Sequence, residues 1–405
     1  MTNPLPHNPA DARKHFPGVS NGIYLETSAR GLLPSAARAA AMAFYDDAVS
    51  GVPKETSPVF DAVERVREKF ARLIGAAADE VTLTRNVTEG LNMMVASLDW
   101  KAGDNAIVCS DIEHPNGVYA LYNMRDRHGI EVRLVNATTD YAMPVDVIEK
   151  RIDPRTRMVI ASSVTFATGA RTSLARLGEF CRRQGVILLV DGAQSVGALD
   201  LPVYAAHVDA LAVGASKYLC GPYGLGFLFI RRELAETMRP AYLGRYSVNL
   251  GDVHEGVLGE AQYRLMPGAR RFDLGSHNYA AANAVDASLD IIGAVTVPVI
   301  EKHVMNLSRK LDAGLRAAGL PMVSGSVANH QSHLVIVGAW RPTAEARQLM
   351  GELSAHYAAR GIRVSERMGR LRFSFHLYNT ADEVDAVIAA TREWKNLPQL
   401  TNVAS

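Results

Sequence analysis

Short hydrophobic runs alternate with longer amphipathic stretches through the middle of the chain. Two of these runs, residues 158–164 and 186–191, are hydrophobic at consecutive positions, as is typical of strands covered by helices on both faces. The stretch between them, 176–185, is amphipathic and ends on a glycine, which predicts a crossover helix. Strands are predicted in the same way at 106–110, 131–136, 158–163, 186–191 and 210–213. The pattern predicts an α/β fold built on a mostly parallel sheet.

The pattern of predicted helices and strands changes after residue 268. Two helices, two strands and a last helix are predicted there, at 278–293, 299–318, 333–337, 371–375 and 381–394. No repeat or long linker marks a boundary between these two parts of the sequence. We place a large domain at 21–280 and a smaller α+β domain at 281–405, and we expect residues 1–20 to pack on the smaller one.

The most hydrophobic window, 210–230, is about long enough to cross a bilayer. It contains Lys217, Pro222 and four glycines, which disfavour a membrane helix. A buried strand, a loop and a second strand explain the window better. A membrane partner is therefore not expected.

The composition bears on several other classes of protein. The 43 Lys and Arg residues balance 42 Asp and Glu residues, so the chain lacks the basic stripe that binds nucleic acid. The three cysteines, Cys109, Cys181 and Cys220, have neither a disulfide framework nor metal-ligand spacing, and they indicate a reducing compartment. The N-terminal residues lack the features of a signal peptide. We expect a cytoplasmic protein with no nucleic-acid partner and no bound metal.

Asp191 and Lys217 carry the strongest chemical signal. Asp191 ends the buried run 186–191, and open parallel sheets bind ligands at the carboxyl ends of their strands. Lys217 follows another hydrophobic run and precedes the glycine-rich stretch 221–226. Burial lowers the pKa of a lysine, which makes its neutral amine available to attack a carbonyl group and to act as a base. Pyridoxal phosphate (PLP) enzymes combine such a lysine with an acidic residue at the pyridine nitrogen, so the pair predicts a PLP site.

Each of the two residues also has a plainer structural explanation. Asp191 could cap the following helix or pair with a polar group in the core. Lys217 could be a solvated lysine after a strand. For each residue taken alone, this structural explanation is the more common one. The presence of both residues in this order within one α/β pattern favours the PLP site.

Three further positions fit a phosphate group and a flat ring. Thr88 opens a helical pattern at which a hydroxyl and backbone N–H groups can hold phosphate, although a simple helix cap explains this motif better by itself. His114 follows a strand, where an imidazole could stack on a ring or lie in an ordinary surface loop. Gly275 and Ser276 form a small turn before a helix, which suits a second phosphate contact or a plain cap.

Residues 370–380 alternate between polar and apolar types, as in a half-buried strand. Arg370, Arg372, Ser374 and His376 would then share one face. An arginine there can bind a substrate carboxylate through two N–H groups. Arginines on a solvated edge strand explain the pattern equally well, so both interpretations stay open.

Together these segments resemble the class V aminotransferase family, a fold-type-I group of PLP enzymes that includes cysteine desulfurases, selenocysteine lyase and isopenicillin N epimerase. The resemblance runs from YLETSARGLLP (24–34) to RFSFHLYNT (372–380), with the landmarks in family order. It implies a large domain with a mostly parallel seven-stranded sheet and a smaller C-terminal domain. It also implies PLP as the cofactor and a homodimer whose active sites are completed across the interface.

The resemblance assigns roles around the cofactor ring. Lys217 is the implied catalytic residue, which forms the Schiff base with PLP. Asp191 and Gln194 match the family's D-x-A-Q pattern, in which they contact the pyridine nitrogen and the phenolic oxygen. His114, in EHPN, matches the histidine that stacks on the ring.

Three more roles lie farther from the ring. Thr88, in NVTEGLN, matches the threonine that binds the phosphate. Ser276, in RFDLGSHN, matches a turn that reaches the phosphate of the neighbouring subunit. Arg372 matches the arginine of the R-x-S-x-x-x-YNT pattern, which binds the substrate α-carboxylate.

Two positions depart from the cysteine desulfurases of this family. Ser216 precedes Lys217, where desulfurases often have histidine, and the loop 361–371 contains no cysteine. Desulfurases need a mobile loop thiol that accepts sulfur as a persulfide, and none of the three cysteines occupies that place. We therefore disfavour a persulfide-forming desulfurase.

The site residues predict the first steps of an enzyme acting on an amino acid or a related amine. Lys217 removes the Cα proton while Arg372 orients the carboxylate. The next step decides the reaction, and we expect transamination. A β-elimination that cleaves a carbon–sulfur bond is the second candidate, with an epimerase or racemase as a further one. Outside the enzymes, a binding protein that keeps the fold without turnover is the alternative. Residues 239–262 are expected to line the substrate entrance.

Overall fold

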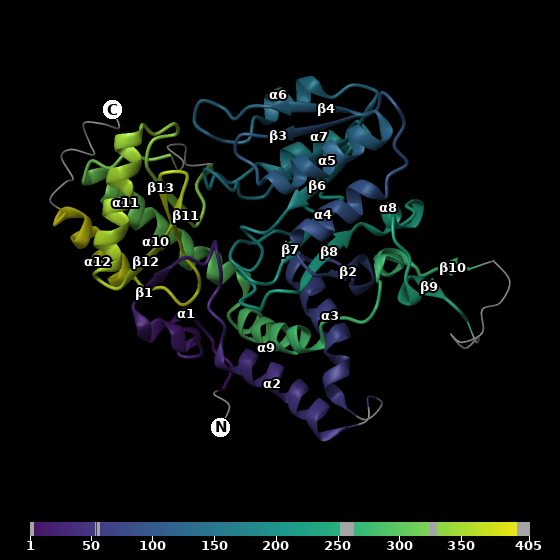
Figure 1. Ribbon diagram of the computed structural model, residues 1–405, viewed down its shortest axis with the longest axis horizontal. Coiled ribbons are helices and arrows are strands. Elements are labelled where there is room, and N and C mark those ends of the chain that lie inside the picture. Colours follow the sequence, from purple (N-terminus) through teal and green to yellow (C-terminus); the bar gives the residue numbers. More distant parts are fainter. Residues whose placement is uncertain (1–3, 53, 55–56, 252–262, 324–329, 395–405) are drawn as a thin grey trace.

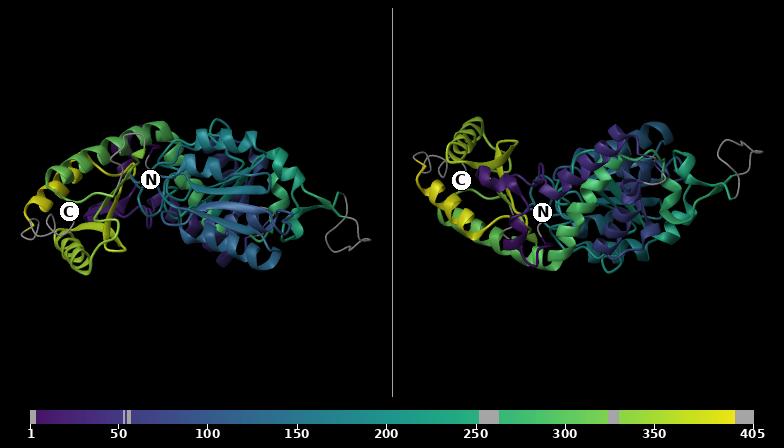
Figure 2. Two further views of the ribbon diagram at one scale, coloured as in Figure 1. Left: turned by 90° about the horizontal axis from the view of Figure 1, so that it is seen from above. Right: turned by 90° about the horizontal axis from the view of Figure 1, so that it is seen from below.

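The structure is a computed structural model that describes residues 4–52, 54, 57–251, 263–323 and 330–394. Its helices and strands form two lobes (Figure 1). The larger lobe holds the central sheet, and the smaller one holds the C-terminal helices and strands. Figure 2 shows the two lobes side by side along the long axis of the molecule. The predicted α/β class is confirmed.

The central sheet contains seven strands in the order β2-β8-β7-β6-β5-β3-β4. Neighbouring strands are parallel except for β8, which runs antiparallel to both β2 and β7. In chain order the strands are β2 (Val81–Thr84), β3 (Asn105–Cys109), β4 (Glu131–Val135), β5 (Thr156–Ser162), β6 (Ile187–Asp191), β7 (Ala210–Gly214) and β8 (Gly226–Ile230). The five strands predicted between residues 106 and 213 are confirmed, as is the strand, loop and strand across 210–230.

Helices cover both faces of this sheet because alternate strand residues point to opposite sides. On one face, Ile107, Leu188 and Phe227 share a hydrophobic core with apolar residues of the covering helices. On the other, Val108 and Leu189 pack in a second core. The first face is covered by α3 (Ala62–Ile74), α6 (Val145–Arg151), α7 (Leu174–Arg183) and α9 (Tyr279–Val295), and the second by α4 (Val87–Ala96), α5 (Pro115–His128) and α8 (Arg232–Thr237).

The smaller sheet has the order β1-β12-β13-β11. Its strands are β1 (Ile23–Leu25), β11 (Leu334–Val337), β12 (Ile362–Arg367) and β13 (Arg370–Ser374). The helices of this lobe are α10 (Val297–Ala317), α11 (Ala344–Ala358) and α12 (Ala381–Arg392). All five residues of β13 are buried and the strand lies between β12 and β11, so the predicted half-buried strand and the edge-strand alternative are both wrong. Its two edges pair with β12 and β11, and the arginines of the face predicted to be exposed lie on aromatic rings, Arg370 on Trp340 and Arg372 on Phe166.

The N-terminal segment contacts the smaller lobe. In α1 (Pro9–Arg13), Arg13 forms an ion pair with Glu383 of α12 at 2.8 Å. The strand β1 pairs in parallel with β12, so the chain adds to the smaller sheet before it enters the larger lobe. The domain limits at residues 21 and 281 stay a prediction.

Helices α9 and α10 meet at Thr296, whose φ of 72° breaks the helical path. Among the described residues no single helix is long and apolar enough to cross a membrane; these two pass such a test only as a pair bent by 78°, on length and composition alone. The remaining long helix, α2 (Ser35–Ser50), lies along α9 in the lower part of Figure 1.

Candidate active site

Lys217 lies on the loop that joins β7 to β8, and two glycines let other segments lie directly against this loop. The backbone N–H of Gly31 donates to the Ser216 carbonyl oxygen at 2.8 Å. A Cβ atom on Gly31 would lie 2.0 Å from the Lys217 carbonyl oxygen, and one on Gly197 would lie 2.2 Å from the Tyr218 carbonyl oxygen. Only glycine fits at either position. The two contacts fix the backbone on both sides of the lysine.

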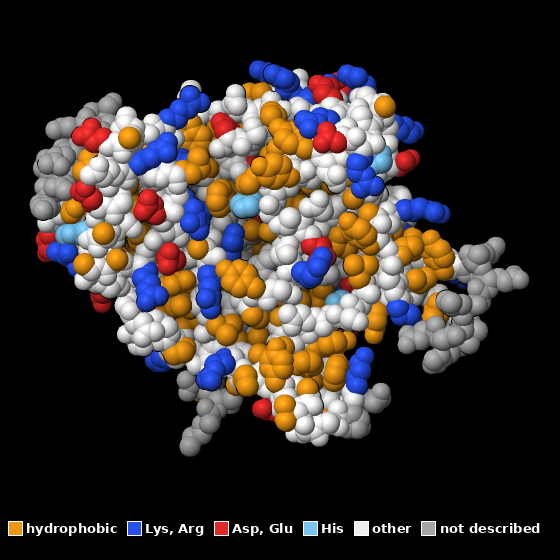
Figure 3. Space-filling model, in the orientation of Figure 1, with side chains coloured by type: hydrophobic (Ala, Val, Ile, Leu, Met, Phe, Trp, Pro, Cys, Tyr) orange, Lys and Arg blue, Asp and Glu red, His pale blue; other side chains and the backbone are white. Residues whose placement is uncertain are grey.

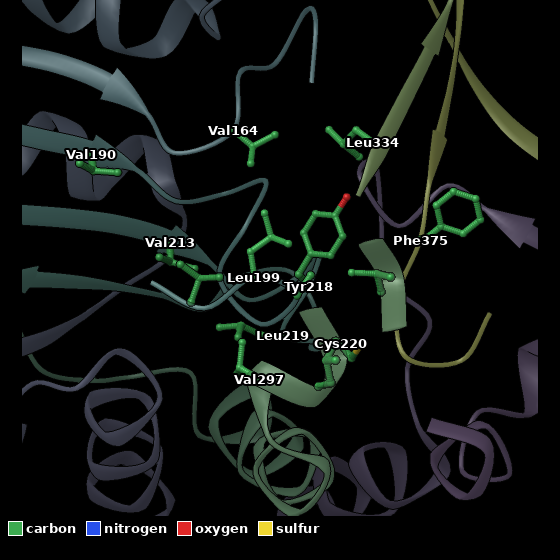
Figure 4. Packing of buried hydrophobic residues seen from close by; sticks show 14 of the residues in the cluster. Val164, Val190, Leu199, Val213, Tyr218, Leu219, Cys220, Val297, Leu334 and Phe375 are labelled. Atoms are coloured by element: carbon green, nitrogen blue, oxygen red, sulfur yellow. The ribbon is translucent and has the colours of Figure 1, made fainter. Parts of the chain in front are cut away.

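The neighbouring Tyr218 anchors the same loop in the hydrophobic core between the two lobes. Figure 4 shows its ring pointing from the Lys217 loop toward Leu334 and Phe375 of the smaller lobe. The His376 Nδ1 accepts from the Leu377 N–H at 2.7 Å, so its Nε2 carries the proton and donates to the Tyr218 carbonyl oxygen at 2.8 Å. Burial lowers the pKa of His376 to about 4, which keeps this ring neutral near pH 7. The smaller lobe therefore holds the lysine loop by a hydrogen bond as well as by packing.

Lys217 and Asp191 interact electrostatically. Burial lowers the pKa of the Lys217 ammonium to about 8; Asp191 opposes this shift, while Arg372 and Arg367 add to it. Burial raises the pKa of Asp191, and Lys217 and His114 oppose that shift. Asp191 ends β6 and accepts a hydrogen bond from the Ala193 N–H at 2.8 Å, which keeps the carboxylate at the end of its strand. The two residues predicted from the sequence thus lie in one site.

Phe166 joins His114 to Arg372. The His114 ring meets the Phe166 ring edge to face, with 4.8 Å between centroids. The Arg372 guanidinium lies 5.2 Å from the same ring, and its Nη1 donates to the Phe166 carbonyl oxygen at 3.3 Å. Burial lowers the pKa of His114, with Asp191 opposing and with Lys217 and Arg372 adding to the shift. Electrostatic interactions therefore connect four of the predicted site residues: Lys217, Asp191, His114 and Arg372.

Gln194 and Thr88 lie at the ends of secondary-structure elements that converge on this region. Gln194 is buried, its Nε2 donates to the Ser28 carbonyl oxygen at 3.3 Å, and its Oε1 has no hydrogen-bond partner among the described residues. Thr88 lies in the first turn of α4, whose cap is Asn86, so Thr88 is not the predicted helix cap. Its hydroxyl accepts a hydrogen bond from Asn116 of α5. The first turns of α4 and α5 thus lie together.

Ser276 lines a cavity of about 650 Å³ next to this cluster. Asn86, Glu89 and Ser216 line the same cavity, so the Ser276 turn faces the first turn of α4 and the lysine loop. Gly275 and Ser276 have φ values of 90° and 47°, as the predicted tight turn requires. A larger cavity of about 730 Å³ contains none of the seven predicted site residues in its lining.

Sequence reasoning missed Glu113, although it directly precedes His114. Its carboxyl group is buried and accepts hydrogen bonds from the Ser162 N–H, at 2.6 Å, and from the Ser162 hydroxyl. Ser162 is paired with Asp191 in the sheet register, so Glu113 lies behind the Asp191 site. Burial raises the pKa of Glu113 to about 8, with Asp191 adding to the shift. Phe166 was also missed, because nothing in its local sequence marks it.

The three cysteines of the chain, Cys109, Cys181 and Cys220, are all buried and form no disulfide. Burial raises the pKa of each thiol. Of the segment 239–262, predicted to line the substrate entrance, residues 252–262 lie outside the described residues.

The sequence profile of the class V aminotransferases matches residues 23–387. The chain belongs to this family. A probable cysteine desulfurase from Methanothermobacter thermautotrophicus is 28% identical over 393 residues, which cover 92% of this chain and 95% of that protein. A cysteine desulfurase from Klebsiella pneumoniae is also 28% identical over 393 residues, covering 93% and 94%. The apo cysteine desulfurase of Thermococcus onnurineus NA1 has the same fold, with a TM-score of 0.82 at 24% identity over 97% of this chain and 98% of that one.

Membership of the class V aminotransferases confirms the predicted family, the fold-type-I architecture and PLP as the cofactor. The predicted reaction is wrong. Relatives that match nearly the whole chain are named cysteine desulfurases, which overturns both the preference for transamination and the argument against a desulfurase. That argument rested on two departures, Ser216 before the lysine and the cysteine-free loop 361–371. These two local differences were too little to exclude the class.

Proposed function

We propose that this chain is a PLP-dependent enzyme that cleaves the carbon–sulfur bond of cysteine or a closely related amino acid. The observation that carries the proposal is the partly buried Lys217 amine, whose pKa is lowered to about 8 by burial and is acted on by the charges of Asp191 and the buried Arg372. The names of the relatives support sulfur as the atom that leaves.

The residues at the site fit PLP. Asp191 would contact the pyridine nitrogen, the Gln194 amide the phenolic oxygen, His114 the face of the ring and Thr88 the phosphate. The Gln194 Nε2 carries two N–H groups, and only one of them donates to the Ser28 carbonyl oxygen, so the other can donate to the phenolic oxygen. When bound, PLP withdraws electrons from the bonds at the substrate Cα.

The side chains of the chain then divide the remaining tasks. Arg372 is 3% exposed and forms no ion pair among the described residues, so its guanidinium is available to a substrate carboxylate. That contact orients the amino acid so that its Cα–H bond faces Lys217. The neutral Lys217 amine takes the Cα proton and holds it for return. Phe166, beneath Arg372 and beside His114, keeps water from this side of the site.

We also propose a homodimer in which Ser276 of one subunit contacts the phosphate held by the other. Met42, Tyr45 and Val49 on α2 are exposed apolar residues. Figure 3 shows hydrophobic side chains gathered over α2 and α9 in the lower part of the molecule, as a subunit interface would need. Light scattering that finds a PLP-loaded monomer would contradict the dimer.

The cytoplasm is the proposed location of the enzyme. Three buried cysteines without a disulfide are compatible with a reducing compartment. Fractionation of cells that express the tagged chain would test this.

The activity is tested by incubating the purified, PLP-loaded protein with L-cysteine and dithiothreitol. Sulfide should appear together with alanine, or with pyruvate and ammonia if the bond breaks by elimination. Lys217→Ala should reduce the rate at least 1,000-fold, an order of magnitude typical of a lost catalytic base and covalent anchor (~10³). Lys302→Ala, at an exposed lysine of α10, is the matched control and should keep the rate.

Absence of sulfide from a folded, PLP-loaded protein would overturn the proposal. So would sulfide release that Lys217→Ala leaves unchanged. Measuring alanine and pyruvate separately shows which set of products accompanies the sulfide.

A further inference from the structure

Two arginines of β13, Arg370 and Arg372, are buried without an anionic partner. Each is 3% exposed, and neither has a carboxylate within ion-pair distance among the described residues. The other buried arginines differ: Arg67, 1% exposed, pairs with Asp273 at 2.7 Å, and Arg271 pairs with Glu236. A buried cation is costly unless an anion accompanies it. The proposed function provides an anion for Arg372 only.

Arg370 has surroundings that favour an incoming anion. Its guanidinium lies 4.8 Å from the Trp340 ring, an arrangement that supports a cation but does not neutralise it. Its Nη2 donates to the Met368 sulfur at 3.5 Å, and its Nη1 has no hydrogen-bond partner among the described residues. Burial is the one cause that lowers the pKa of Arg370, since no charged neighbour contributes. Strong donors are therefore left unused in the core.

The two guanidinium groups belong to one small cavity. Arg370, Arg372 and the exposed Arg367 line it together with Phe166 and Met368. Its volume of about 10 Å³ admits one group of the size of a water molecule, such as a single anionic oxygen. Arg367 and Arg372, which line this cavity with Arg370, also lower the pKa of Lys217, so two of its three arginines lie within electrostatic reach of the amine.

We propose that Arg370 forms a second anion site beside Arg372 and binds a negatively charged group on the side chain of the substrate. Residues i and i+2 of a strand lie about 6.6 Å apart on one face, a gap that two arginine side chains can close around a short substrate with two anionic groups. The substrate class is thus an α-amino acid whose β-substituent is anionic. The inference rests on the proposed function, because Arg372 takes the α-carboxylate there.

The test compares two ligands of nearly equal shape, L-aspartate and L-asparagine, which differ in one negative charge. Each is titrated into the PLP-loaded enzyme, and binding is followed by the change in the visible absorbance of the cofactor. L-Aspartate should bind at least tenfold more tightly. Arg370→Gln should reduce that preference at least tenfold, and Arg370→Lys should restore part of it because the charge returns without the fork of N–H groups.

Arg341→Gln is the matched control, since Arg341 is an exposed arginine next to Trp340. It should leave the affinities for both ligands unchanged. The cofactor spectrum of Arg370→Gln shows whether the variant is folded and holds PLP. If it does not, the affinities of Arg370→Lys for L-aspartate and L-asparagine are measured in its place.

Equal affinity of the unmodified enzyme for the two ligands would overturn the second anion site. Equal weakening of both ligands by Arg370→Gln would also overturn it, because Arg370 would then act only on the fold. Turnover of L-cysteine is assayed separately, so an unmodified enzyme that releases sulfide but shows no preference for L-aspartate refutes this inference alone. Aspartate preference without sulfide release refutes the proposed reaction and not the site.

Discussion

The lowered pKa of Lys217 predicts how quickly the cofactor-free protein captures PLP at a given pH. Burial lowers the pKa of this ammonium from 10.5 to about 8. At pH 7 the neutral fraction is then about one in ten, whereas an ordinary lysine would have about one neutral amine in 3,000. Only the neutral amine attacks the aldehyde, so the lowered pKa increases the reactive form about 300-fold.

The rate of PLP capture should rise with pH through a midpoint set by the pKa of Lys217, and two substitutions should move this midpoint in opposite directions. Arg372 lowers the pKa of Lys217 because two cations repel each other, so Arg372→Gln should raise the midpoint. Asp191 raises the pKa of Lys217 by favouring the ammonium, so Asp191→Asn should lower the midpoint. The sign of each shift follows from the charge that is removed and does not depend on how tightly the variant holds PLP.

The assay mixes cofactor-free protein with PLP in a stopped-flow instrument and follows the visible absorbance of the Schiff base from pH 6 to pH 10. The rate should rise with pH through a midpoint near 8, and Lys302→Ala should have the same midpoint as the unmodified protein. A midpoint near 10.5, as for an exposed lysine, would refute the reasoning. Shifts of the same sign in Arg372→Gln and Asp191→Asn would refute the electrostatic part of it.

Three further substitutions test how the fold supports the site. Gly197→Ala places a Cβ atom 2.2 Å from a backbone oxygen of the lysine loop, at a φ of 103°. It should lower the free energy of unfolding in urea by roughly 1–3 kcal/mol and weaken PLP binding. The control is Gly185→Ala, at a φ of 67° with open space around it, which should lower the free energy of unfolding by less. Asp273→Asn removes the buried anion of Arg67 and leaves it only the half-exposed Glu64 at 3.4 Å, so thermal or urea unfolding should show a loss of about 3 kcal/mol. Burial raises the pKa of Glu113 from 4.5 to about 8, so between these two pH values the folded protein holds a proton that the unfolded chain has released. The free energy of unfolding therefore falls as the pH rises from about 4.5 to about 8. Glu113→Gln should flatten that decline, and an unchanged pH profile of unfolding would contradict it.

The central sheet could be predicted from the sequence because its strands carry their own signal. The run 186–191 is hydrophobic at every position but the last, and it forms β6 with both faces covered. The strand β2 was missed because Val81–Thr84 alternates with threonines, and its position depends on pairing with β8, more than 140 residues later. The strand β13 was predicted to be half-buried because its alternation of arginine and apolar residues suggests one solvent-exposed face. In the structure Trp340 and Phe166 lie against the arginines of that face.

The predicted site residues share a local signal that the missed ones lack. Asp191 and Lys217 follow hydrophobic strands, and the ends of parallel strands meet at one edge of a sheet. Phe166 has no such signal, since it becomes a platform only where the chain from the smaller lobe brings Arg372 onto its ring. The reaction could not be predicted either, because the residues that start the chemistry are common to the family.

The lysine loop makes clear why the two lobes act as one site. The larger lobe provides Lys217 and Asp191, and the smaller lobe provides Arg372 and the hydrogen bond from His376 to the Tyr218 carbonyl oxygen. A change in the position of the smaller lobe would therefore move Arg372, the arginine proposed to bind the substrate carboxylate, and loosen the backbone next to the lysine at the same time. Arg372 also lowers the pKa of Lys217. If a substrate carboxylate neutralises Arg372, as proposed, it should raise that pKa and favour proton uptake by the amine just when the Cα proton is to be removed.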